Sequence, residues 1–380
     1  MRWLHRALGL TAGLVLVVTG LSGSALVFRE EIDRALNPHL LRVEPTAARA
    51  PLQAILDAAA RAYPTEPATR VRMPRGPDGT YEVWLGAAPE RYVYADPYRD
   101  GAILGARRPT EFLTGWLFLV HAHLLSGEAG HTVAGVAALL LVVLSASGLV
   151  VWWPRGGRGA GSRWRAALTV ARGAGGGRVT YDLHRAVGFY ASALLLLAGV
   201  TGASLVFHEA FQRAAYWVTG TVAPPAVPSR VSAPTAAVAS LPVDSLLARA
   251  VRAQPGGVIS YLYLPTAPGQ TFRVRQRLPG EQHPNGKSFV HVDPTAGRVV
   301  AAEDGARAAG GARLYSVLYP LHVGVLGGWP TRVLTVAAGL SLPLLAVTGF
   351  LVWRRRARRR HAGSGEVPAA VGRWSTIRRV

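Results

Sequence analysis

Four long apolar stretches dominate the pattern of hydrophobic and polar positions. They cover residues 7–28, 133–153, 186–207 and 333–353, and each is nearly free of charged side chains. A helix needs about 20 predominantly apolar residues to cross a bilayer, so the pattern predicts four transmembrane helices. A cleavable signal peptide is the alternative for the first stretch. The third stretch closely resembles it and lies inside the chain, which argues against that alternative.

The long segments after the first and third spans follow a different pattern. Each contains one stretch with apolar residues at helical spacing, 51–62 and 241–253, and then short runs with strand-like alternation. Turn-forming residues separate the runs. The predicted strands are residues 69–73, 80–85 and 91–95 in the first segment and 258–264, 271–278 and 288–292 in the second. Each segment is therefore expected to form a small α+β domain.

The chain carries the same pattern twice. Leu4-His5-Arg6-Ala7 opens the first span, Leu183-His184-Arg185-Ala186 opens the third, and the two spans match without a gap. Leu119-Val120-His121 likewise matches Pro320-Leu321-His322 ahead of the second and fourth spans. Each half is then a helix, an extramembrane domain and a helix, and such parallel repeats predict a pseudo-twofold axis along the membrane normal. The expected fold class is a mainly α membrane protein with two α+β extramembrane domains.

These patterns divide the chain into segments. The four spans with their flanks are 1–28, 133–153, 183–207 and 333–353, the extramembrane domains are 29–111 and 208–312, the apolar segments at the outer interface are 112–132 and 313–332, and the cytoplasmic segments are 154–182 and 354–380.

Arginine residues set the expected orientation. They cluster before the first span, between the second and third, and after the fourth, as in Arg354-Arg355-Arg356. The positive-inside rule assigns these segments to the cytoplasm, so both termini are expected there, as in a multi-pass protein of the bacterial inner membrane. The formal net charge of +21 lies mainly in these flanks, where it serves topology and contact with anionic lipid. Nucleic-acid binding is therefore not indicated.

The absence of cysteine narrows the possible redox chemistry. Without cysteine there are no disulfides, iron–sulfur clusters or thioether-bound c-type haem. Histidine is the main remaining ligand, since the only methionines are Met1 and Met73. His5 and His184 each head a span with a stripe of small residues. The stripes are Gly9, Gly13, Gly20 and Gly23 below His5, and Gly188, Ser192, Gly199 and Gly202 below His184.

A stripe of small residues has two interpretations. It permits close helix packing, and it also leaves room for a flat macrocycle beside an axial ligand. Histidines so near the interface could instead face lipid headgroups. Their duplication favours the cofactor.

His121 and His322 form the second matching pair. The first span rises about 35 Å from His5 to Phe28 at 1.5 Å per residue, so the two histidine pairs are expected at opposite membrane faces. Two facing imidazoles suit the axial positions of a b-type haem, and we expect two haems, bound by His5 with His184 and by His121 with His322. Zinc is disfavoured because neither level offers a third and fourth ligand.

His123, His131 and His208 have no histidine counterpart in the other half of the chain, where they align with Gly324, Arg332 and Arg29. His123 and His208 are reserve candidates for an outer ligand or a role on the substrate side, so the choice between His121 and His123 stays open. His131 is secondary. We expect the remaining histidines to be ordinary surface residues; these are His39, His283, His291 and His361.

Several motifs resemble the PepSY-associated transmembrane family. They are Leu4-His5-Arg6-Ala7-Leu8-Gly9-Leu10, Thr19-Gly20 through Asp33, His121-Ala122-His123-Leu124-Leu125-Ser126-Gly127-Glu128, Ser147 through Pro154, Asp182 through Phe189, and Pro320-Leu321-His322. The resemblance implies PepSY-like modules outside the membrane, with turns at Asp96-Pro97 and Asp293-Pro294. Members of the family include iron-regulated inner-membrane proteins and haem-containing reductases that release iron from ferric siderophores in the periplasm.

The resulting hypothesis is an inner-membrane dihaem reductase. It would pass electrons from an unidentified cytoplasmic or membrane donor to a periplasmic ferric siderophore or other iron complex, and no catalytic residue beyond the haem ligands is assigned. One rival is a non-enzymatic PepSY regulatory or scaffold protein, for which the duplicated histidines have no use. The other is an iron or siderophore transporter, which the repeats would suit, although the spans carry no acidic residue at mid-membrane depth.

Overall fold

The computed structural model describes residues 1–46, 48–87, 90–154, 160–171, 173–225, 227 and 240–363. Among these residues, four helices are long and apolar enough to cross a membrane: α1 (Arg2–Leu26), α6 (Gly127–Trp152), α8 (Gly176–Val206) and α13 (Trp329–Gly363). The prediction of four apolar helices is confirmed, and the chain is a membrane protein. Helices α8 and α13 extend past the predicted spans at their arginine-bearing ends. Residues 155–159 and 364–380 of the predicted cytoplasmic segments lie outside the described residues.

The four long helices pack as a ring in which α1 contacts α6 and α13, and α8 contacts the same two helices. Small and aliphatic side chains fill the centre, among them Ala12, Leu16, Ala137, Leu141, Ala191 and Leu195. Two glycines bring neighbouring backbones close. A Cβ on Gly20 would lie 2.8 Å from the carbonyl oxygen of Gly339, and one on Gly199 would lie 2.9 Å from that of Ala138. At these two positions the small-residue stripe serves helix packing.

All eight strands outside the membrane belong to one antiparallel sheet, among the described residues, with the order β4-β3-β2-β1-β5-β6-β7-β8. The strands are β1 (Ala68–Arg72), β2 (Tyr81–Leu85), β3 (Arg91–Ala95), β4 (Ile103–Arg107), β5 (Val258–Tyr263), β6 (Phe272–Arg277), β7 (Ser288–Val292) and β8 (Val299–Glu303). The two predicted extramembrane segments share this sheet because β1 pairs with β5, with Arg70 opposite Tyr263 and Val71 opposite Leu262.

The outermost strands β4 and β8 were not predicted. Both are edge strands of five residues, and β4 contains Gly105, which weakens the strand signal. Pairing between the two segments was also not predicted, because alternation along a strand reveals its faces and not its neighbours.

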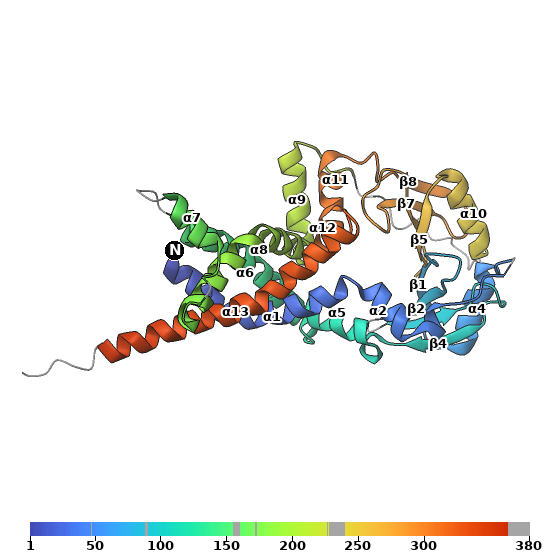
Figure 1. Ribbon diagram of the computed structural model, residues 1–380. Coiled ribbons are helices and arrows are strands. Elements are labelled where there is room, and N and C mark those ends of the chain that lie inside the picture. The colour runs from blue at the N-terminus through green and yellow to red at the C-terminus, as the bar shows by residue number, and fades with distance from the viewer. Residues whose placement is uncertain are drawn as a thin grey trace, which may run out of the picture.

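Helices α4 (Leu52–Ala62) and α10 (Val243–Ala253) cover one face of the sheet and bury its apolar side chains. Asp244 of α10 accepts hydrogen bonds from the backbone N–H groups of Leu52 and Gln53, both at 2.9 Å, and so caps the start of α4. Figure 1 shows both helices on the side of the sheet that faces away from the membrane helices. The opposite face of the sheet is therefore turned toward the membrane.

Short helices connect the membrane helices to the sheet. They are α2 (Arg29–Leu36), α3 (Pro38–Leu41), η1 (Pro109–Glu111), α5 (Leu113–His123), α9 (His208–Thr219), α11 (Gly310–Ser316) and α12 (Leu318–His322). Helix α5 packs on α1, and α12 packs on α8, so the apolar segments predicted near the outer interface do contain helices. Helix α7 (Ala160–Leu168) and the N-terminus lie at the end of the bundle away from the sheet (Figure 1).

Candidate functional site

The four histidines of the two predicted pairs meet as predicted. The ring centres of His5 (α1) and His184 (α8) are 6.3 Å apart, and those of His121 (α5) and His322 (α12) are 6.1 Å apart. His121 contacts α1 between Thr19 and Gly23. The two levels are therefore separated along α1 by roughly 21–27 Å at 1.5 Å per residue. The His5–His184 pair lies toward the N-terminal end of α1, and the His121–His322 pair lies toward the sheet.

Each ring of the His5–His184 pair is fixed by a neighbouring helix. Nδ1 of His5 lies 3.2 Å from the carbonyl oxygen of Leu144 and 3.1 Å from the hydroxyl of Ser147, both on α6. Nδ1 of His184 lies 3.1 Å from the carbonyl oxygen of Leu345 and 3.0 Å from the hydroxyl of Thr348, both on α13.

The His121–His322 pair is fixed in the same manner. Nδ1 of His121 lies 2.9 Å from the carbonyl oxygen of Thr19 and 3.5 Å from the hydroxyl of Ser22, both on α1. Nδ1 of His322 lies 3.0 Å from the hydroxyl of Thr201 on α8, with a further hydrogen bond to the backbone of Ala198.

Contacts with backbone carbonyl oxygens set the tautomer of His5, His184 and His121. A backbone carbonyl oxygen can only accept, so Nδ1 must carry the proton and donate it. His322 follows the same pattern, because the Thr201 hydroxyl already donates to the carbonyl oxygen of Leu197 at 2.7 Å and so accepts from Nδ1 of His322. The lone pair then resides on Nε2, and the ring is held in a fixed orientation. Such an arrangement is typical of metal-ligating histidines, whose second nitrogen donates to a carbonyl, a carboxylate or water.

Four glycines make room for the histidine rings. A Cβ on Gly148 would lie 3.1 Å from Cε1 of His5, and one on Gly349 would lie 3.1 Å from Cε1 of His184. At the other level, a Cβ on Gly23 would lie 2.7 Å from Cε1 of His121, and one on Gly202 would lie 3.2 Å from that of His322. A side chain at any of these positions would press on the ring. The imidazoles can therefore lie directly against the helix backbones.

The expectation for the small-residue stripes needs a correction. Gly23 and Gly202 make room for the histidines at the opposite level and not for those heading their own helices. A Cβ on Gly9 would lie 3.8 Å from Leu144, and one on Gly188 would lie 3.6 Å from Leu345. Nothing lies within 4 Å of a Cβ built on Gly13, so space remains beside α1 there.

The ring separations fit a shared metal ion. Two imidazoles on opposite sides of one metal, each with a metal–nitrogen distance of about 2.0 Å, have ring centres ~6.3 Å apart. Within the described part of the chain, no group of three or more metal-ligating side chains occurs. Each pair thus offers two protein ligands.

The reserve histidines lie apart from both pairs. His123 stacks on His131 with ring centres 4.9 Å apart, and its Nδ1 contacts the carbonyl oxygen of Gly127 at 3.3 Å. His208 is exposed at the start of α9. Between the two candidates for an outer ligand, the structure brings His121 and not His123 together with His322.

Two histidines that we expected at the surface are buried. His283 and His291 are 6% and 4% exposed, whereas His39 is exposed as expected and the side chain of His361 lies outside the described residues. Burial and the nearby charges of Arg275 and Lys287 lower the pKa of His283 to about 3. The neutral ring stacks on Tyr319 of α12 at 5.0 Å and so joins the sheet to the helix that carries His322.

The hydroxyl partners of the histidines were missed from sequence. Ser147 and Thr348 occupy matching positions in the two halves, directly before the aligned Gly148 and Gly349, and Ser22 matches Thr201 in the same way. The signal was present in the repeat alignment. Serine and threonine are so common in membrane helices, where they bond their own backbone, that they do not stand out as partners of a ligand.

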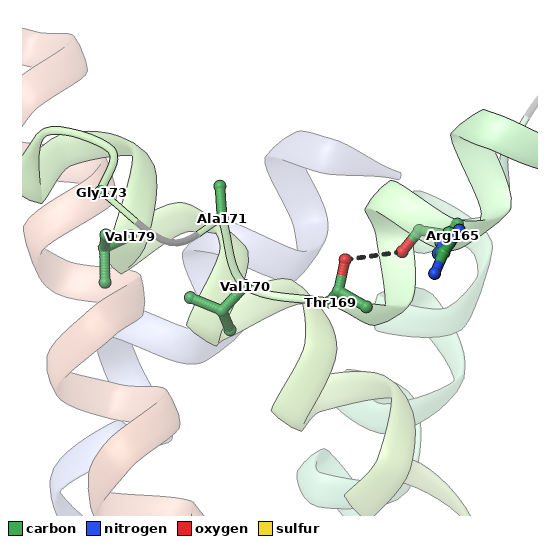
Figure 2. Close-up of a pocket in the computed structure, with 6 residues that line it drawn as sticks. All are labelled: Arg165, Thr169, Val170, Ala171, Gly173 and Val179. Carbon is green, nitrogen blue, oxygen red and sulfur yellow. Dashed lines mark hydrogen bonds between the residues drawn. The ribbon is translucent and has the colours of Figure 1, made fainter.

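A hollow at one end of the helix bundle lies apart from the histidine pairs. It has a volume of about 1000 Å³ and is lined by Arg165, Thr169, Val170, Ala171, Gly173 and Val179, at the connection between α7 and α8 (Figure 2). The Thr169 hydroxyl donates to the backbone of Arg165 at 2.8 Å. None of these side chains can ligate iron at neutral pH, so the histidine pairs remain the candidate site.

Comparison with known proteins supplies the class of this membrane protein. The model of the PepSY-associated transmembrane region matches residues 2–356, which covers both histidine pairs and the whole sheet. The chain belongs to this family, as its motifs indicated. No curated protein matches its sequence.

Proposed function

We propose that the protein is a dihaem b-type membrane oxidoreductase that reduces a ferric complex on the side of the membrane where the sheet lies. The observation that carries the proposal is the presence of two histidine pairs with ring centres 6.3 and 6.1 Å apart, one toward each end of the bundle. A haem iron takes two axial ligands from the protein when both its axial sites are filled, and each pair supplies that number.

The residues of each pair suit this role. Nε2 of His5 and of His184 would ligate one haem, and Nε2 of His121 and of His322 the other. The donated Nδ1 protons orient the rings and raise the basicity of the ligating nitrogens. When bound, the two haems would supply one-electron carriers at the two membrane faces. The ferric complex accepts one electron and becomes ferrous, and a one-electron donor at the other face supplies it.

The recurrence of contacts supports a twofold arrangement. His5 bonds Leu144 and Ser147, and His184 bonds the matching Leu345 and Thr348. A pseudo-twofold axis along the membrane normal, with the arginine-flanked ends of the helices in the cytoplasm, would place the sheet in the periplasm of an inner-membrane protein. PepSY-like units at 29–111 and 208–312 would then form the docking side for the iron complex.

Visible absorption separates this function from its rivals. Full-length protein purified in detergent from haem-replete cells should show a Soret band that shifts on reduction with dithionite. After removal of excess dithionite under anaerobic conditions, the reduced protein should convert an added ferric chelate to ferrous iron. Colourless protein would support the anchored scaffold instead. Uptake of a labelled ferric siderophore into vesicles without reduction would support the transporter.

Gly23→Ala should selectively weaken the His121–His322 site. The new Cβ would lie 2.7 Å from Cε1 and 3.0 Å from Nδ1 of His121, which forces the ring away from Thr19 and Ser22. We expect haem content to fall from two toward one per chain, measured as the pyridine haemochrome. Gly161→Ala on α7 is the control, because nothing lies within 4 Å of a Cβ at that position and α7 carries none of the four histidines. Equal haem content in the two variants would contradict this assignment.

A further inference from the structure

The membrane-facing side of the sheet carries a row of aromatic and arginine side chains. Strand register places Tyr92 (β3), Trp84 (β2), Arg70 (β1), Tyr263 (β5) and Arg273 (β6) opposite one another in succession. Their neighbours along the strands, such as Val71, Val83 and Leu262, point to the other face and are fully buried beneath α4 and α10. The row therefore crosses the junction between β1 and β5 at the centre of the sheet.

The members of this row stack on one another. The rings of Trp84 and Tyr92 have centres 4.7 Å apart. The Arg70 guanidinium lies 4.3 Å from the ring centre of Trp84 and 5.1 Å from that of Tyr263, while the Arg273 guanidinium lies 4.7 Å from the same Tyr263 ring. We call these five residues, Tyr92, Trp84, Arg70, Tyr263 and Arg273, the aromatic–arginine row. All five are partly exposed.

The charges of the row are not balanced. Nε of Arg70 is buried without a hydrogen-bond partner, and neither Arg70 nor Arg273 forms an ion pair within the described residues. Of the carboxylates near the row, Glu82 accepts from the indole N–H of Trp84 at 2.5 Å and lies 3.7 Å from Arg72. Glu90 lies close enough to Tyr92, at the end of the row, to act on it electrostatically.

Other arginines on this face behave differently. Arg72 pairs with Glu30 at 2.6 Å, and Arg107 pairs with Asp33 at 2.5 Å. Arg72 and Arg107 thus have carboxylate partners, whereas Arg70 and Arg273 are left with aromatic contacts. Aromatic faces attract flat rings, and a guanidinium provides a planar fork for anionic oxygens. The row is therefore complementary to a ligand that has both a flat ring and anionic oxygens.

The row also lies on the same side of the sheet as helices α5 and α12, which carry His121 and His322. Figure 1 shows this face turned toward the membrane helices, with the arm containing α2 and α5 on one side and the arm containing α9, α11 and α12 on the other. Helix α5 ends two residues after His121, and helix α12 ends at His322. A ligand held on the row would sit on the same side of the membrane as that pair.

We propose that the aromatic–arginine row binds a planar aromatic anion, and that the ferric complex the protein reduces is accordingly one chelated by aromatic oxygens of the catecholate class. The statement that the bound complex is the substrate rests on the proposed function. The statement that the row binds a planar aromatic anion rests on the row alone. The anionic oxygens of a catecholate would receive hydrogen bonds from Arg70 and Arg273, and its rings would pack against the parts of Trp84 and Tyr263 that remain exposed.

Equilibrium dialysis of the full-length protein in detergent tests the proposal with three radioiron complexes. Ferric tris-catecholate has rings and negative charge, ferric citrate has negative charge without rings, and ferric tris-acetohydroxamate has neither. We expect the catecholate complex to bind at least about tenfold more tightly than either of the others, the difference that one charge-assisted hydrogen bond or one stacked ring can supply. Equal binding of catecholate and citrate would show that only charge is recognised and would overturn the proposal.

Variants assign the binding to the row. Arg70→Gln and Arg273→Gln should each weaken catecholate binding by about tenfold or more, and Arg70→Lys should retain part of the affinity because it keeps the charge. Arg252→Gln is the matched control, since Arg252 is exposed on α10 beyond the other face of the sheet. Unchanged binding in Arg70→Gln and Arg273→Gln, with unchanged elution in size exclusion, would overturn the assignment. If a glutamine variant does not fold, Trp84→Phe against Trp84→Ala tests the stacking surface instead, with loss of affinity expected only for alanine.

This experiment is independent of the proposed redox function. Dialysis measures binding whether or not haem is present. A haem-loaded protein that reduces ferric chelates but does not prefer the catecholate complex would leave the function standing and defeat the inference. A colourless protein that binds catecholate through the row would do the reverse.

Discussion

Replacing His184 with alanine should halve the haem content of the purified protein, from two haems per chain to one. The substitution removes one imidazole of the His5–His184 pair and leaves the His121–His322 pair, roughly 21–27 Å away along α1, untouched. The fold should persist, because the hydroxyl of Thr348 that loses its partner still donates to the backbone of Leu344 at 2.7 Å. Haem per chain is measured as the pyridine haemochrome against protein concentration.

Three further variants make this result specific. His322→Ala should lower the haem content by the same amount through loss of the other site, and the double variant should bind none. His208→Ala is the control, because His208 is exposed on α9 and belongs to neither pair. Full haem content in both His184→Ala and His322→Ala would refute the proposed pairing.

The second large effect concerns the joint between the sheet and the membrane helices. Arg107 of β4 donates to Asp33 of α2 at 2.8 and 2.5 Å and to the hydroxyl of Tyr94 at 2.9 Å, and its guanidinium lies 3.8 Å from the ring centre of Phe112, directly before α5. The Arg107 and Asp33 side chains are 6% and 16% exposed. Removing one partner of such a buried pair leaves the other charge uncompensated.

We therefore expect Arg107→Met to lower the free energy of unfolding by about 3–5 kcal/mol. A denaturant titration followed by tryptophan fluorescence would report the change. Arg213→Met is the matched control, since the Arg213–Glu209 pair is 75% and 74% exposed and its ions sit 3.7 Å apart in solvent, where ion pairs contribute little. Equal unfolding midpoints for the two variants would indicate that the Arg107 cluster does not stabilise the contact between the sheet and the membrane helices.

The sequence predicted the parts of the site that a repeat can encode. Gap-free matching of His5 with His184 and of His121 with His322 predicted both pairs, and the structure has their ring centres 6.3 and 6.1 Å apart. The apolar spans were equally clear, since a bilayer demands a continuous run of apolar residues. Their ends were less clear, because arginines continue α8 and α13 as helix beyond the apolar run.

The sequence did not reveal which elements and side chains contact each other across the fold. Neither the pairing of β1 with β5 nor the contact of Gly23 with His121 has a local signature. Periodicity shows which face of an element is apolar and leaves open what covers that face. The burial of His283 was missed for the same reason, since its environment consists of Arg275 from β6 and Tyr319 from α12.

In the proposed function, imidazoles from the two halves of the chain share an iron porphyrin at each of two levels. The most direct measurement is the haem-to-protein ratio of the full-length protein purified from haem-replete cells, combined with its reduced absorption spectrum. We expect two haem b per chain, with the low-spin spectrum of iron ligated by two histidines. Protein that is folded and monodisperse yet binds no haem after reconstitution with excess haemin would contradict it.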